Sequence, residues 1–138
     1  KRLIKSPKLY FIDTGLLRYL LRVRNAVELG THPSRGAIFE TWVVSEALKN
    51  CHNRGVEADL YFWRDSTGHE IDLLIDQGAA QIPVEIKSGQ TVASDFFADL
   101  NSWRTLAGEP TGPAALVYGG ESSFRRSDVT VMSWADWA

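Results

Sequence analysis

Two short runs in which apolar residues alternate with other residues, 70–75 and 82–87, constrain this chain more than any other feature. A period of two separates the faces of a β-strand. The first run is expected to divide into Ile71, Leu73 and Ile75 on one face and Glu70, Asp72 and Leu74 on the other. The second is expected to divide into Ile82, Val84 and Ile86 on one face and Pro83, Glu85 and Lys87 on the other. Residues 76–81 between them include the turn residues Asp76 and Gly78, so the two runs predict an antiparallel β-hairpin.

The register of this hairpin brings two acidic side chains together. If Ile75 is the last paired residue before the loop and Ile82 the first after it, Asp72 lies directly opposite Glu85, with the side chains roughly 5 Å apart. Two like charges at that separation repel each other. A positive group is therefore expected between them, either a divalent cation or the ammonium of Lys87.

The acidic pair and the neighbouring lysine predict a site for a divalent metal ion. A hard cation such as Mg²⁺ prefers oxygen ligands, keeps several waters and leaves open positions for a phosphate. Asp72 and Glu85 together with a backbone carbonyl would form such a site. Lys87 would then lie beside the metal, where it could orient or deprotonate a water, or offset charge that develops on phosphate oxygens.

A simpler explanation competes with the metal site. A Glu-x-Lys pair on a strand is also typical of the solvated face of an amphipathic sheet. Both acids, however, stand within apolar stretches, 71–75 and 84–86, so their strands are expected to be mostly buried. A buried charge needs a partner, which favours the site over the solvated face.

A helix predicted over residues 36–49 supplies a third acid. Apolar residues recur in it at intervals of three and four, and Glu40 falls within that stripe. Its carboxylate is therefore expected to point toward the sheet, where it would complete an acidic cluster with Asp72 and Glu85. Spacing alone leaves open the alternative that Glu40 is an ordinary helix glutamate at the edge of the stripe.

These residues carry a resemblance to known families. Asp72, followed by Glu85-Ile86-Lys87 at the end of the next strand, resembles the PD-(D/E)xK signature of the restriction-endonuclease-like nuclease superfamily, although Ile71 stands where that signature has proline. More of the chain is similar to a narrower family, the domain-of-unknown-function family 4143, which forms the C-terminal part of many prokaryotic AAA+ type ATPases. The similar motifs occur in the same order, at residues 6–16, 36–40, 70–72 and 84–89.

The resemblance implies a restriction-endonuclease-like core in which the acidic cluster lies where the central strands diverge. It implies that Mg²⁺, with Mn²⁺ as a substitute, is bound by Asp72, Glu85 and the carbonyl of Ile86. Glu40 would bind a second metal or a metal-bound water, and Lys87 would position the attacking water. The reaction would be hydrolysis of phosphodiester bonds, with DNA as substrate in preference to RNA. The upstream ATPase domain of the same chain would be a partner.

Outside the hairpin, periodicity and turn residues predict an α/β fold with a mixed central sheet and helices on both faces. Residues 1–35 are expected to be an N-terminal lead-in with a short helix, capped by Asp13 or Thr14, followed by a loop over 22–35. Residues 36–138 would form the nuclease-like domain. Its predicted elements are a helix over 36–49, a three-strand meander over 60–63, 70–75 and 82–87, a helix over 94–108, a buried strand over 114–118 and a last strand over 129–132.

Net charge, cysteine content and the length of apolar runs limit the kinds of protein to which this chain can belong. A net charge of -2 gives no global attraction to nucleic acid, so any DNA-binding surface must be local. The single cysteine, Cys51, can form no internal disulfide, which fits a reducing cytoplasm. No apolar run approaches the length of a membrane-spanning helix, so no membrane partner is expected. The sequence also lacks a G-x-x-x-x-G-K-[ST] loop that would hold nucleotide phosphates.

The first residues suggest a larger context. The chain starts at Lys1 without a methionine, which indicates a piece of a longer protein, as the resemblance also implies. The same stretch contains a basic cluster of four residues, Lys1, Arg2, Lys5 and Lys8. This cluster is expected to be a solvated linker or inter-domain face, and contact with phosphates is the alternative.

Two alternatives to a nuclease stay open. The chain could be a non-catalytic module that binds DNA or a partner domain for the ATPase, or a plain α/β scaffold with a solvated acidic face.

Overall fold

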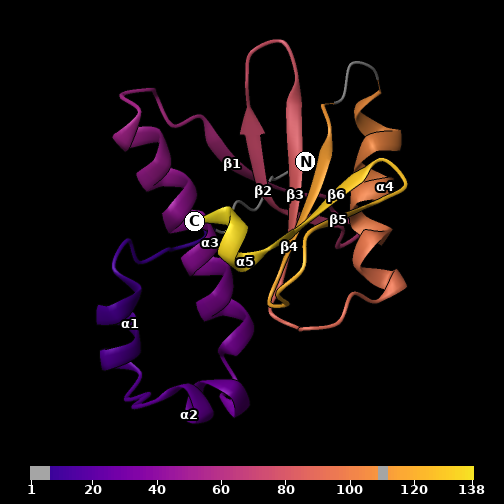
Figure 1. Ribbon diagram of the computed structural model, residues 1–138. Helices are drawn as coiled ribbons and strands as arrows, with labels where there is room; N and C mark the ends of the chain where they lie inside the picture. The colour runs from indigo at the N-terminus through magenta and orange to yellow at the C-terminus, as the bar shows by residue number, and fades with distance from the viewer. Residues whose placement is uncertain (1–6, 109–111) are drawn as a thin grey trace.

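The computed structural model describes residues 7–108 and 112–138, which fold into one central sheet with helices on both sides (Figure 1). The helices are α1 (Thr14–Leu20), α2 (Ala26–Thr31), α3 (Arg35–Asn53), α4 (Ala98–Ala107) and α5 (Trp134–Trp137), with a 3₁₀ turn at Ser94–Phe97 before α4. The strands are β1 (Leu60–Arg64), β2 (Glu70–Asp76), β3 (Gln81–Lys87), β4 (Ala114–Tyr118), β5 (Phe124–Arg126) and β6 (Val129–Ser133).

The sheet is mixed, as the sequence predicts. Its strand order is β1-β2-β3-β4-β6-β5. The first three strands form the expected antiparallel meander. β3, β4 and β6 are parallel neighbours, and β5 closes the edge as an antiparallel partner of β6. The predicted α/β class with a mixed sheet and helices on both faces is therefore confirmed.

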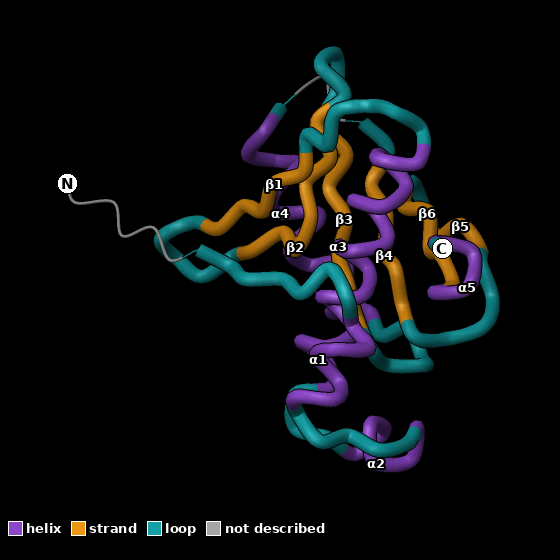
Figure 2. Tube along the Cα trace, turned by 90° about the vertical axis from the view of Figure 1, so that its left-hand side faces the viewer, coloured by secondary structure: helices purple, strands orange, loops and turns teal. Residues whose placement is uncertain are grey.

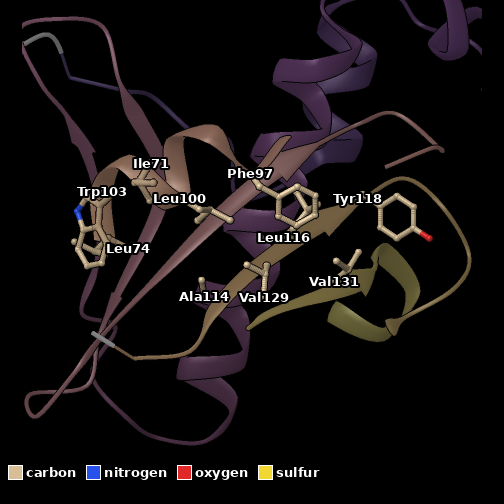
Figure 3. Packing of buried hydrophobic residues seen from close by; sticks show 10 residues of the cluster. All are labelled: Ile71, Leu74, Phe97, Leu100, Trp103, Ala114, Leu116, Tyr118, Val129 and Val131. Atoms are coloured by element: carbon tan, nitrogen blue, oxygen red, sulfur yellow. The ribbon is translucent and has the colours of Figure 1, made fainter. Parts of the chain in front are cut away.

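Each face of the sheet has its own apolar core, one beneath α3 and one beneath α4. The α3 core contains Val43, Leu73, Val84, Ile86 and Val117, among others. The α4 core contains Ile71, Leu74, Phe97, Leu100, Trp103, Ala114, Leu116, Tyr118, Val129 and Val131 (Figure 3). β4 supplies side chains to both cores, and all five of its residues are buried. This double burial explains why its sequence is apolar without alternation.

α1 and α2 extend beyond the end of the sheet, next to the first turns of α3 (Figures 1 and 2). Asp13 caps α1 as predicted, since its carboxylate accepts a hydrogen bond from the Leu16 N–H at 3.0 Å. The predicted loop over 22–35 is wrong because it contains α2. Asn25 initiates that helix, with its side-chain oxygen accepting from the Glu28 N–H at 2.9 Å. Asparagine is common both in turns and at N-caps, so the residue type alone does not distinguish a loop from a helix start.

Candidate functional site

The hairpin of β2 and β3 has the predicted register, with Ile75 opposite Ile82 and Leu73 opposite Val84. The regular pairing ends there, one step before Asp72 and Glu85. From Val84 to Lys87, β3 pairs with β4 on its other side. The carboxylate of Asp72 bridges the position where β2 and β3 separate, since its Oδ2 accepts a hydrogen bond from the Ile86 N–H at 2.9 Å.

A β-bulge in β2 places Asp72 at this separation. Tyr61 pairs with Leu74 and Trp63 pairs with Ile71, so the single Phe62 of β1 faces two residues of β2, Asp72 and Leu73. An extra residue reverses the alternation of side chains before it and re-aims them. Bulges of this kind are common beside functional sites.

The bulge corrects one prediction from the sequence. Strict alternation predicts Ile71 on the face of Leu73, but Ile71 lies in the α4 core with Leu74, whereas Leu73 lies in the α3 core. The strict alternation over residues 70–75 is therefore wrong at Ile71. Nothing in the sequence signals this extra residue, because a period-two pattern fits the run equally well with or without it.

Glu85 is the most deeply buried acid of the site, with 3% of its surface exposed. It lies opposite Leu116 of β4, so its side chain points to the α4 face of the sheet. Its Oε1 is 2.5 Å from the Nζ of Lys87, two residues along the same strand. Its Oε2 is buried and has no hydrogen-bond partner among the described residues. A buried carboxylate oxygen in this state is an available ligand position.

Glu40 lies on the other side of the sheet and reaches Asp72 only through a lysine. Its Oε1 accepts hydrogen bonds from the Nζ of Lys8 and the hydroxyl of Tyr10, each at 2.7 Å. The same Nζ is 3.7 Å from Asp72 Oδ1 and also forms an ion pair with Glu70. Glu40 and Glu85 thus flank Asp72 from opposite sides. Among the residues that the structure describes, no three His, Cys, Asp or Glu side chains surround a common metal position.

Lys8 is the site residue that the sequence pattern did not identify. The pattern groups it with the basic cluster as a solvated linker, but its side chain is only 19% exposed and contacts three carboxylates. The other members of that cluster, Lys1, Arg2 and Lys5, lie outside the described residues. One signal was present in the sequence: in the extended segment before α1, Lys8 and Tyr10 share a face by period two, and both bind Glu40.

Burial and the charge of a neighbouring carboxylate raise the pKa values of both central acids. For Glu85, burial and then the charge of Asp72 raise the pKa to about 7 from an ordinary 4.5, and together they outweigh the ion pair with Lys87. For Asp72, burial and the charge of Glu40 raise the pKa, against the opposing effects of the Ile86 hydrogen bond and the two lysines. Glu85 is therefore partly protonated near neutral pH, and a bound cation would displace that proton.

The lysines remain charged in this setting. Burial would lower the pKa of Lys8, but its hydrogen bonds to Glu40 and Glu70 outweigh burial and raise that pKa well above the usual range. Burial likewise opposes the charge on Lys87, and the bond to Glu85 with the surrounding carboxylates raises the pKa of Lys87. Each ammonium is thus held by the acids around it.

The donor set fits a hard divalent cation. Asp72 and Glu85 offer two carboxylates from adjacent strands, one oxygen of which is buried without a partner among the described residues. Mg²⁺ is commonly bound by one or two carboxylates, with water and substrate phosphate in the other positions. The predicted third ligand, the carbonyl of Ile86, belongs to the segment where β3 pairs with β4, opposite Val117.

Two pockets lie away from Asp72 and Glu85. One of about 700 Å³ is bordered by α1, α2 and α3, with Arg18, Phe39 and Trp42 in its wall. The other, of about 490 Å³, lies toward the C-terminal end of α3, near Cys51, Asp59 and Asp76. Neither is lined by Asp72, Glu85 or Lys87.

Comparisons with known proteins place these observations in context. The sequence model of the family described as "Domain of unknown function (DUF4143)" matches residues 35–137. Two uncharacterized proteins, one from Mycobacterium bovis and one from Mycobacterium tuberculosis, are each 32% identical over 136 residues. The match covers 99% of this chain, which spans 29% of the length of each relative. No solved structure matches the chain.

None of the helices in the described ranges, 7–108 and 112–138, has the length and apolar character needed to span a membrane.

Proposed function

The chain belongs to the DUF4143 family, and we propose that it is a metal-dependent nuclease domain that hydrolyses phosphodiester bonds of DNA. One observation carries the proposal: the partly buried carboxylate of Asp72 accepts from the Ile86 N–H where β2 and β3 separate, on the strand that carries the buried Glu85 and its partner Lys87. Acids whose pKa values are raised by burial and by a neighbouring carboxylate are costly to folding, and such groups concentrate at functional sites.

Asp72 and Glu85 are the residues that would hold Mg²⁺, or Mn²⁺ in its place, with the Ile86 carbonyl as a third ligand. A divalent ion at this position supplies a Lewis acid for the phosphate and a more acidic bound water. Asp72 is kept in place by the Ile86 N–H, which fixes one of its oxygens. Glu85 is fixed by burial and by Lys87.

Lys87 is the residue that would position the attacking water. Its side chain is 34% exposed, so the ammonium reaches solvent while Glu85 holds it from beneath. The ring of Phe96 lies 5.9 Å from the Nζ and borders it on another side. A restrained ammonium at the mouth of an acidic site can orient a water and offset negative charge on phosphate oxygens.

The resemblance to PD-(D/E)xK nucleases supports the same assignment. Asp72 and Glu85-Ile86-Lys87 match the signature residue by residue, except that Ile71 replaces its proline. The position of these residues where β2 and β3 separate supports this proposal. We further propose that the domain acts within a longer cytoplasmic protein that contains an ATPase part, because the family resemblance implies that part and the relatives are much longer.

A direct test is cleavage of DNA by the purified protein. Supercoiled plasmid and a 5′-labelled single strand are incubated with Mg²⁺ or Mn²⁺, and with EDTA as the metal-free control. The proposal expects metal-dependent cleavage that Asp72→Asn removes. Cleavage that persists in EDTA, or in the variant at the wild-type rate, contradicts it.

A second function is favoured by a separate observation, the exposed apolar surface of α1 and α2. Every residue of these helices is at least partly exposed, including Leu16, Tyr19, Leu20 and Val27. Several large apolar side chains exposed on neighbouring helices favour an interface. On this alternative the chain is a non-catalytic accessory module that binds DNA or the ATPase part. A gel-shift titration in rising salt distinguishes the DNA-binding form, since phosphate contacts weaken steeply with salt.

A further inference from the structure

Lys8 occupies the centre of a cage of acidic side chains. Its Nζ lies 2.7 Å from Glu40 Oε1 and 3.7 Å from Asp72 Oδ1, and it forms an ion pair with Glu70. The ring of Phe62 borders it, with the centroid 5.6 Å away. The ammonium is therefore held by groups from α3, β1 and β2.

The acidic side chains of this cage come from two elements. Glu40 comes from α3, Glu70 is the first residue of β2, and Asp72 lies in the bulge of that strand. Three carboxylates around one point repel each other unless a positive charge stands between them. Tyr10 adds a second donor to Glu40 from the same extended segment as Lys8, which keeps that segment in place over the acids.

The charges already present leave little room for a second metal ion. Lys8 and Arg64 face the carboxylates of Glu40, Glu70 and Asp72. A divalent ion among these three carboxylates would have to lie beside the Lys8 ammonium, which repels it.

We propose that Lys8 replaces a second metal ion, so that the site works with a single divalent cation between Asp72 and Glu85. This inference rests on the proposed nuclease function. Asp72 contacts both the Lys8 ammonium and the proposed metal position, because its Oδ1 faces Lys8 and its Oδ2 faces the β3 side. Lys8 is then a positioning residue, which orients Asp72 and neutralises Glu40 and Glu70. The assignment of Glu40 changes accordingly, from a ligand of a second metal to a ligand of Lys8.

The test counts metal ions and measures cleavage in the same preparations. Calorimetric titration with Mn²⁺ is expected to give one ion per wild-type chain and two per Lys8→Ala chain at high Mn²⁺, because the variant opens the acidic cage. Cleavage by Lys8→Ala is expected to fall by roughly 10²-fold at limiting Mn²⁺, and to recover when Mn²⁺ is raised. Lys8→Arg keeps the charge and is expected to bind one ion.

A matched control is Lys49→Ala, which removes a lysine that pairs with Glu46 on α3, outside the acidic cage. It should bind one ion and cleave at the wild-type rate. Two wild-type ions overturn the Lys8 inference whether or not the variants fold, because that count needs no variant. Unchanged or faster cleavage by folded Lys8→Ala at limiting Mn²⁺ also overturns it. Absence of Mn²⁺ binding to wild type overturns the proposed function itself, and the inference with it.

Discussion

Asp72 and Ile86 are joined by a hydrogen bond of 2.9 Å, from the backbone N–H of Ile86 to the carboxylate of Asp72, at the position where β2 and β3 separate. The bond replaces the strand pairing that ends one residue earlier. It sets one oxygen of Asp72 beside the strand that carries Glu85 and Lys87, while the other oxygen faces Lys8. The local break in the sheet is thus what assembles the acidic site.

Replacing Asp72 by asparagine should separate folding from activity. The amide oxygen of the introduced side chain can still accept from the Ile86 N–H, so the free energy of unfolding should change by less than about 1 kcal/mol. Cleavage of plasmid should fall by at least roughly 10²-fold because one negative metal ligand is lost. Asp128→Asn, which alters an exposed partner of Arg104, serves as the control. An Asp72→Asn protein that folds and cleaves like Asp128→Asn contradicts the assignment.

Replacing Lys87 by alanine should remove cleavage while leaving metal binding. Lys87 carries the water-positioning role, whereas Asp72 and Glu85 carry the metal. Mn²⁺ binding should therefore persist and be as strong or stronger, since a competing positive charge next to Glu85 is gone. The plasmid cleavage rate should fall by roughly 10²-fold or more. Loss of Mn²⁺ binding with retained cleavage would reverse these roles, and Lys49→Ala again provides the comparison.

The metal-free protein should become less stable as pH rises from about 4.5 to about 7. The folded-state pKa of Glu85 is about 7, against an ordinary 4.5. Between these values the folded state holds more protons than the unfolded chain, so the free energy of unfolding falls with increasing pH. The raised pKa of Asp72 acts in the same direction. Urea unfolding at pH 5 and pH 8, in the presence of EDTA, measures the difference.

Glu85→Gln should reduce that pH dependence because it removes one of the two acids whose folded-state pKa is raised. At pH 8 the variant should be more stable than the wild type, by roughly 1–3 kcal/mol. The unpaired Lys87 offsets little of this gain, since its ammonium reaches solvent. Glu46→Gln, on α3, should keep the wild-type pH dependence. An equally steep fall in stability for Glu85→Gln would show that another group titrates.

The α4 core offers a test of the fold that does not depend on the function. Leu100 is fully buried and Leu106, on the same helix, is 72% exposed. Leu100→Ala should cost about 2–5 kcal/mol of unfolding free energy, because it leaves a cavity in the core. Leu106→Ala should cost less than about 1 kcal/mol. Similar losses for both variants in urea unfolding would mean that α4 packs by another face.

Much of this architecture follows from residue patterns. The register of the hairpin follows from the placement of Ile75 and Ile82 around a turn, since one face of each strand has to be buried. The burial of β4 on both faces follows from its continuous apolar run. The inward position of Glu40 follows from the helical period of α3. Each of these rests on local periodicity, which sequence carries directly.

The parts that sequence did not reveal depend on tertiary contacts. The bulge at Asp72 leaves no periodic signal. β5 is a short, exposed edge strand whose residues, Phe124–Arg126, carry no alternation of burial. Lys8 stands within a basic stretch that is typical of a solvated linker, and its role is evident only when the extended segment is placed over Glu40 and Asp72. Long-range charge pairing of this kind has no local pattern.

The most direct test of the central claim is calorimetric titration of Mn²⁺ into the wild-type protein beside Asp72→Asn and Glu85→Gln, followed by plasmid cleavage in the same preparations. The account predicts saturable binding and metal-dependent cleavage in the wild type, and loss of both in each variant. Absence of binding in the wild type, or equal binding and cleavage in the folded variants, would contradict the claim that Asp72 and Glu85 form a metal-dependent nuclease site.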